Sequence, residues 1–175
     1  MSTPSTMEFF SLLTAQTFGS SACGCGGDEG VRIRRVALRL PSQADARFSN
    51  PMDVQKAARD FRGVNFIVPH FGAGYFRETL LLAAHCPNVY LDTSSANGWL
   101  RYMPYPMDLK LVCQRTLYAV GPERLIFGTD SSWFPRGFRR EILEEQLSIL
   151  EVLGMAKADV QRIMGGNMAR LLRLA

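Results

Sequence analysis

Short apolar segments alternate with helical patterns along this chain, and this alternation indicates its fold class. The apolar segments occupy residues 65–69, 89–92 and 124–130. A short apolar run bounded by turn residues is typical of a strand covered on both faces, as in parallel sheets. Helices placed between such strands form βαβ units. The sequence therefore predicts an α/β fold built on a parallel sheet.

The segments between these runs have the pattern of amphipathic helices. One helix is predicted to begin at Pro51, because Asn50 is a capping residue and proline favours the first helical position. In the last long helix, Leu143, Leu147 and Leu150 form a stripe predicted to face the core. Further helices are expected over residues 75–86, 109–120 and 139–153, followed by one or two shorter ones.

The first 47 residues have a different character. Residues 7–18 are compatible with a short amphipathic helix, and residues 19–27 are a coil of small residues. Residues 31–40 alternate apolar residues with arginine, as in a strand exposed on one face. We therefore divide the chain into an N-terminal segment, 1–47, without a clear pattern and a regular domain, 48–175.

The charge distribution argues against nucleic-acid binding. The net charge is +4, but the 20 basic residues are scattered among 16 acidic ones. The densest basic spot contains Arg32, Arg34, Arg35 and Arg39. A solvated loop explains it as well as a binding patch does, because an electrostatic footprint requires clustering.

Composition and cysteine usage indicate a globular, cytoplasmic protein. The chain is 47% hydrophobic and 21% charged, as in folded globular domains. No apolar run approaches the ~18 residues that span a bilayer, so no membrane association is expected. Four cysteines occur without a secretory signal, and we expect them to be reduced thiols.

A polar residue stands at or just after the end of each predicted strand. These residues are His70, Asp92 and Asp130. In parallel α/β folds, functional groups gather at the C-terminal ends of the strands. His70 is compatible with either a hydrogen-bonded structural role or a functional one. For Asp92 a turn or capping role is favoured over catalysis. For Asp130, capping of the loop at Ser131-Ser132 and catalysis both remain open.

Four motifs together resemble the amidohydrolase-related family, in the branch that contains aminocarboxymuconate-semialdehyde decarboxylase and related lactone hydrolases. They read FIVPHFGAG at 66–74, NVYLDTS at 88–94, GPERLIFGTD at 121–130 with Pro135 following, and IMGGNMARLL at 163–172. Their order and spacing make the resemblance specific. It implies the C-terminal part of a (β/α)8 TIM barrel, with about three βα units and C-terminal helices. The barrel is expected to be incomplete, because a full one needs ~250 residues.

The resemblance also implies roles for particular residues. His70 resembles the family's catalytic histidine after the sixth strand, and Asp130 its metal-bound aspartate after the eighth. The implied cofactor is a divalent metal, with zinc expected, which lowers the pKa of bound water towards ~7. Asp130 would then bind the metal and accept a proton, while His70 orients the nucleophile or stabilises negative charge. Arg136 is a candidate for binding a substrate carboxylate, with an ordinary surface role as the alternative.

Other metal ligands of the family have no counterpart in this chain. The family also uses a His-x-His pair after the first strand and a histidine after the fifth, whereas the histidines here are His70 and His85. By order, the fifth-strand ligand would fall in residues 31–41. Two explanations are open: this region has diverged, or it comes from a shifted reading frame that rejoins the family near Arg47. The abrupt start of the resemblance favours the second.

Two functions are therefore expected from the sequence. The first is a metal-dependent hydrolase or decarboxylase that acts on a small carboxylated or cyclic substrate. The alternative is a catalytically inactive remnant, or one half of a split barrel, that acts only through protein association. Because an incomplete parallel sheet exposes strand edges, we also expect self-association or pairing with a missing barrel half.

Overall fold

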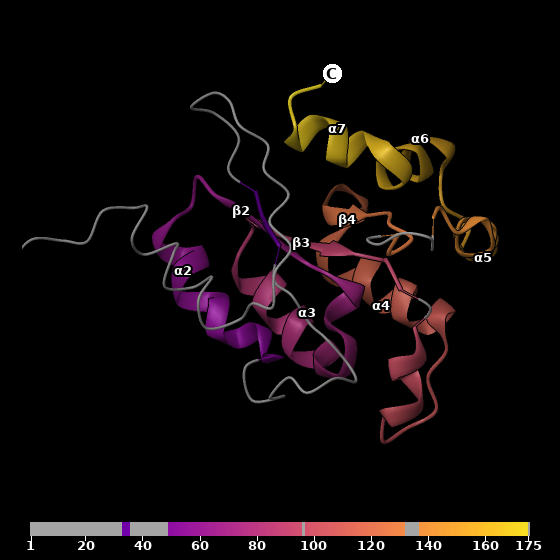
Figure 1. The fold of residues 1–175 in the computed structure, drawn as a ribbon, viewed down its shortest axis with the longest axis horizontal. Helices are drawn as coiled ribbons and strands as arrows, with labels where there is room; N and C mark the ends of the chain where they lie inside the picture. The colour runs from indigo at the N-terminus through magenta and orange to yellow at the C-terminus, as the bar shows by residue number, and fades with distance from the viewer. Residues whose placement is uncertain (1–32, 36–48, 96, 132–136, 175) are drawn as a thin grey trace, which may run out of the picture.

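A four-stranded parallel sheet organises the part of the chain that the computed structural model describes, which is residues 33–35, 49–95, 97–131 and 137–174. The strands lie side by side in chain order, β1-β2-β3-β4 (Figure 1). They are β1 (Ile33–Arg35), β2 (Asn65–Val68), β3 (Val89–Asp92) and β4 (Leu125–Ile126). Residues 7–18, residues 19–27 and Arg136, for which the sequence suggested a helix, a coil and a substrate-binding role, lie outside the described residues.

The last strand is shorter than the sequence predicts. Strands β2 and β3 have nearly the expected bounds, but β4 ends at Ile126, whereas the predicted strand continues to residue 130. The reason is a tertiary contact: the Phe127 amide donates to the carbonyl of Ile163, at 2.9 Å. This bond takes the backbone out of the sheet ladder, so the segment that leads to Asp130 is a loop.

The helices predicted after residue 48 are present, and their caps explain where two of them begin. The Asn50 side chain accepts from the Met52 amide at 3.0 Å, and the Asp108 side chain accepts from the Leu111 amide at 2.7 Å. None of the described helices has the length and apolar character needed to cross a bilayer. The α-helices are α2 (Gln55–Asp60), α3 (Phe76–His85), α4 (Leu109–Val120), α5 (Arg140–Val152), α6 (Lys157–Gln161) and α7 (Asn167–Leu171). Shorter 3-10 turns are η2 (Pro51–Val54), η3 (His70–Tyr75), η4 (Gly98–Tyr102) and η5 (Pro122–Arg124), and η6 (Arg162–Gly166) is a π-helical turn.

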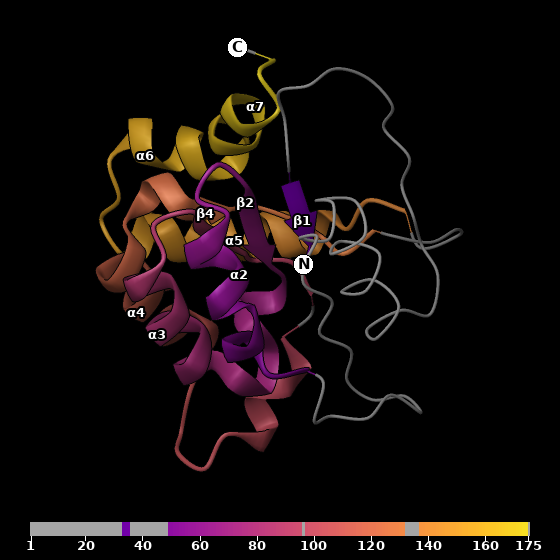
Figure 2. The ribbon, with the colours of Figure 1, turned by 90° about the vertical axis from the view of Figure 1, so that its left-hand side faces the viewer.

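Strands β2, β3 and β4 are buried on both faces. Successive strand residues point to opposite faces, and the larger core lies on the face covered by α3 and α4. The second face carries a smaller cluster, on which α7 packs from the other side (Figure 2). Strand residues in the larger core are Phe66, Val68, Val89, Leu91 and Leu125, and those in the smaller cluster are Ile67, Tyr90 and Ile126, with Leu171 and Met168 from α7. This arrangement agrees with the expected three βα units plus C-terminal helices.

The buried face of α5 differs from the predicted leucine stripe. Ile142, Gln146 and Leu150 are buried, whereas Leu147 is 38% exposed and Leu143 only partly buried. The helix is rotated because Gln146, a polar residue, points into the core and finds hydrogen-bond partners there. The prediction was therefore correct for Leu150 and wrong for Leu147.

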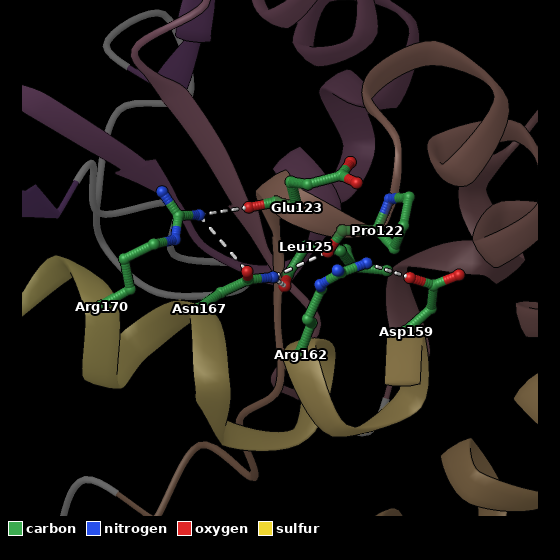
Figure 3. A network of polar contacts seen from close by, with 7 residues as sticks. All are labelled: Pro122, Glu123, Leu125, Asp159, Arg162, Asn167 and Arg170. Atoms are coloured by element: carbon green, nitrogen blue, oxygen red, sulfur yellow. Dashed lines mark hydrogen bonds and ion pairs between the residues drawn. The ribbon is translucent and has the colours of Figure 1, made fainter. Parts of the chain in front are cut away.

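A network of polar contacts fixes α7 to the beginning of β4 (Figure 3). The Asn167 side-chain amide donates to the carbonyls of Pro122, at 2.7 Å, and Leu125, at 2.8 Å. Arg170 donates to the Glu123 carbonyl at 2.9 Å. Asn167 is 2% exposed, so its two bonds are shielded from water, whereas the bond from Arg170 is exposed. The IMGGNMARLL motif thus supplies the residues that attach the C-terminal helix to the sheet.

Candidate active site

The three polar residues singled out from the sequence follow neighbouring strands at one edge of the sheet. His70 follows β2, Asp92 ends β3, and Asp130 follows β4. Adjacent strands lie about 4.8 Å apart, so the ends of β2 and β4 are separated by about 10 Å with β3 between them. The parallel topology therefore brings His70 and Asp130 to the same edge, as expected.

The imidazole of His70 is anchored through one of its two nitrogens. Its Nδ1 lies 3.0 Å from the carbonyl oxygen of Ser94 and 2.9 Å from the Ser94 hydroxyl. A carbonyl only accepts hydrogen bonds, so Nδ1 must carry the proton, and in the neutral ring Nε2 keeps its lone pair. Among the described residues Nε2 has no hydrogen-bond partner. This nitrogen is therefore available to accept or donate a proton.

The segment that holds the imidazole is itself fixed on several sides. The Asp92 carboxylate accepts from the Ser94 amide at 2.5 Å, which confirms the turn role expected for this aspartate. The Thr93 amide donates to the Ile126 carbonyl at 2.9 Å. Gln146 donates to the Thr93 carbonyl at 3.0 Å and accepts from its hydroxyl at 2.6 Å. Because Thr93 and Ser94 are each 1% exposed, water does not compete for these bonds.

The loop that carries Asp130 packs against the same segment. A Cβ atom built on Gly128 would lie 2.9 Å from Cβ of Ser94 and 3.0 Å from Oδ1 of Asp92. Only a residue without a side chain permits this approach. Ser94 is therefore the common neighbour of the loops that carry His70 and Asp130.

Backbone strain is concentrated at this edge of the sheet. Seven non-glycine residues in the described part have positive φ, and six of them follow β2, β3 or β4. Such conformations cost about 1–3 kcal/mol each and persist only where the surroundings determine them, which is most often at functional sites. The six are His70 (φ 58°), Phe71, Ala73, Ser95, Asn97 and Asp130 (φ 56°).

The described residues do not by themselves form a complete metal site. Among them, no group of three or more His, Cys, Asp or Glu side chains is placed to hold an ion, whereas zinc sites usually have three or four protein ligands. His70 and Asp130 lie at the expected edge. The second histidine, His85, ends α3 just before β3, at the opposite end of the strands. Without further ligands, the described part of the site offers the side chains of His70 and Asp130 alone.

Two supporting residues were not singled out from the sequence. Ser94 is part of the NVYLDTS motif, but its contact with His70 depends on how β2 and β3 end. Gln146 has a recognisable signal, because it is a polar residue within an otherwise apolar helix face.

Comparison with known proteins identifies relatives of this chain. The model of the amidohydrolase family matches residues 35–174. The protein fluG of Emericella nidulans is 31% identical over 94 residues, which are 51% of this chain and 10% of fluG.

Two solved structures share the fold. A crystal structure of an amidohydrolase from Burkholderia multivorans with bound zinc is 20% identical, with a TM-score of 0.52 over 69% of this chain and 48% of that one. An uncharacterized TIM-barrel protein from Bordetella bronchiseptica is 21% identical, with a TM-score of 0.58 over 81% of this chain and 44% of that one. The chain thus spans about a tenth of fluG and less than half of either structure. The family match covers most of the sequence, so this chain belongs to the amidohydrolase family and has part of a TIM-barrel fold.

Proposed function

We propose that this chain contributes His70 and Asp130 to the active site of a metal-dependent hydrolase or decarboxylase that acts on a small carboxylated or cyclic substrate. The observation that carries the proposal is the imidazole of His70. It is held through Nδ1 by a buried segment, and its Nε2 is left available at the edge of the sheet where TIM-barrel enzymes place their catalytic groups.

The side chains present suit proton transfer. In a hydrolysis, Nε2 of His70 accepts the proton of the attacking water as the water oxygen bonds to the carbonyl carbon and the π electrons of the carbonyl bond move to its oxygen. When the carbonyl forms again, the bond to the leaving group breaks and the proton on Nε2 moves to that leaving group. In a decarboxylation, the ring of His70 begins as the imidazolium. The bond to the carboxyl group breaks, carbon dioxide leaves, the electron pair stays on the substrate carbon, and the proton on Nε2 moves to that carbon. The Asp130 carboxylate is the second proton acceptor of the proposed site, and Arg136 is proposed to pair with a substrate carboxylate.

The proposal includes a divalent metal, for which zinc in the Burkholderia amidohydrolase is the supporting observation. Asp130 is proposed as a ligand. The described residues supply too few ligands, so the others would come from outside them. We propose that self-association or a missing barrel half completes the site, because each outer strand of the described sheet, β1 and β4, pairs with one neighbour there. A molar mass equal to one chain in light scattering would contradict self-association.

Substitution of the two residues tests the proposed catalysis. The rate of hydrolysis of small lactones, or of decarboxylation of small carboxylates, should fall about a hundredfold or more in His70→Ala and in Asp130→Ala. The matched control is Glu151→Ala, which removes an exposed carboxylate of α5 and should leave the rate unchanged.

Unchanged rates in both site variants would refute the proposed roles. Metal analysis tests the metal separately. After loading with zinc, less than about a tenth of an equivalent per chain would contradict the metal part of the proposal for this chain.

A further inference from the structure

A pocket lies at the opposite end of the sheet from His70. It has a volume of about 480 Å³ and is formed by α2 and the loops before β2 and β3. Arg62 precedes β2, whereas His70 follows it, so the length of the strand separates the pocket from the candidate active site. The lining residues are Gln55, Ala58, Arg59, Arg62, His85, Cys86, Pro87 and Asn88.

The charge that lines this pocket is positive. Apart from a buried thiol, every titratable side chain in the lining is basic. The basic side chains are Arg59, Arg62 and His85, and no carboxylate is among the lining residues. The acidic residue between the two arginines in sequence, Asp60, is already paired with Lys56. Four other arginines of the described part pair with Glu or Asp, but neither Arg59 nor Arg62 has such a partner there. The pocket therefore gathers positive charge without a counter-charge from the described residues.

The thiol in the lining does not supply that counter-charge. Cys86 is 1% exposed, and its burial raises the pKa of the thiol, so the group is neutral at physiological pH. The positive guanidinium groups of Arg59 and Arg62 lower this pKa, but by less than burial raises it. Both positive charges therefore act at the buried thiol, which is consistent with their lining one pocket.

The walls of the pocket are held together by a single side chain. The Asn88 amide nitrogen donates to the carbonyls of Ala58, at 3.0 Å, Phe61, at 3.3 Å, and Val64, at 2.8 Å. These bonds fix the loop before β3 to the end of α2 and to the loop before β2. A pocket whose backbone is fixed before binding loses less entropy when a ligand enters.

We propose that this pocket binds the phosphate group of a small molecule, with Arg59 and Arg62 as the principal ligands and His85 as a third donor. Two permanent positive charges match the two negative charges of a phosphate monoester. The planar guanidinium also presents paired donors to phosphate oxygens. The volume lies within the range of small-molecule pockets, ~300–1,000 Å³, so an organic group can accompany the phosphate.

Nuclear magnetic resonance of the full chain tests the site with inorganic phosphate as the probe. The two histidines of the chain give separate ring signals, which the variant His70→Ala assigns. At fixed pH and ionic strength, phosphate should shift the His85 ring signals saturably, with a dissociation constant of about 1 mM or lower. In the double variant Arg59→Gln/Arg62→Gln, this affinity should fall about tenfold or more.

The control removes the same charge elsewhere. Lys110→Gln/Arg115→Gln changes two exposed residues of α4 and should leave the affinity unchanged. A shift of the His85 signals that does not saturate, or an equal affinity in the Arg59/Arg62 variant, would overturn the site. Acetate that binds as tightly as phosphate would overturn the choice of ligand class. Amide spectra of each variant establish that it is folded. Because no catalysis is measured, this outcome is independent of the role proposed for His70.

Discussion

Replacing Gly128 by alanine tests the contact that joins the two loops of the candidate site. The added methyl group would meet Cβ of Ser94 at 2.9 Å and Oδ1 of Asp92 at 3.0 Å. Neither atom moves freely, because Asp92 accepts from the Ser94 amide and Ser94 holds His70. Gly128 has no positive φ, so alanine meets no left-handed backbone penalty at this position and the destabilising effect comes from the contact. The loss of glycine's freedom in the unfolded chain acts in the opposite direction, and the control below measures it.

The magnitude follows from the packing. Inserting a methylene into a well-packed core costs about 1–3 kcal/mol, which corresponds to a loss of roughly 5- to 150-fold in the folding equilibrium constant. If the strain is relieved by displacing Ser94, the bond to Nδ1 of His70 weakens. The neutral imidazole then loses its preference for a proton on Nδ1. Gly128→Ala should therefore lower both the free energy of unfolding and the population of the Nδ1–H tautomer.

Two measurements check this expectation. Unfolding in urea gives the free energy, and the nitrogen chemical shifts of the His70 ring give the tautomer populations. The control is Gly63→Ala, because a Cβ at Gly63 meets nothing within 4 Å. Wild-type stability and wild-type tautomer populations in Gly128→Ala would together refute the reasoning about this contact.

Two further predictions concern groups away from the candidate site. Asn88→Ala removes three hydrogen bonds to backbone carbonyls and should lower the free energy of unfolding in urea by about 1–3 kcal/mol; a change below about 0.5 kcal/mol would contradict this. Burial raises the pKa of Cys113 to about 12 from its ordinary value of 9.0, so the folded state resists ionisation of this thiol. The protonated Cys113 thiol leaves the free energy of unfolding unchanged below pH 9. Between pH 9 and 12 this free energy falls as the pH rises, because in that range the thiol ionises in the unfolded chain but not in the folded one. Stability measured from pH 8 to 11 should therefore fall less steeply in Cys113→Ala than in the wild type, and equal slopes would refute this.

Much of the fold was predictable because its signals are local. The apolar runs of β2 and β3 are bounded by turn residues, and the helices after Asn50 and Asp108 begin at capping side chains. The end of β4 was not predictable, since the bond that ends it comes from Ile163, more than thirty residues further along the chain. The orientation of α5 was missed for a similar reason. Gln146 is bonded to Thr93, which follows β3, and a helical pattern does not contain that distant partner.

The candidate site was predictable in its location but not in its contacts. The ends of parallel strands placed His70 and Asp130 at one edge, and the turn role of Asp92 followed from its residue type. The anchoring of His70 by Ser94 depends on positive φ angles at His70 and Ser95, which sequence alone does not reveal. The catalytic roles of His70, Asp130 and Arg136 stay predictions until the variants are measured.

The position of α7 has a consequence for folding during synthesis. Among the described residues, the apolar cluster on the second face of the sheet is covered by Leu171 and Met168 of α7. Asn167 attaches α7 to β4. These residues are translated after the strands that they cover. While the ribosome still holds them, Ile67, Tyr90 and Ile126 lack that cover, and apolar strand residues exposed in this way favour aggregation. The nascent chain is therefore most vulnerable before α7 has emerged from the ribosome, when a chaperone that shields apolar strands would have its largest effect on yield.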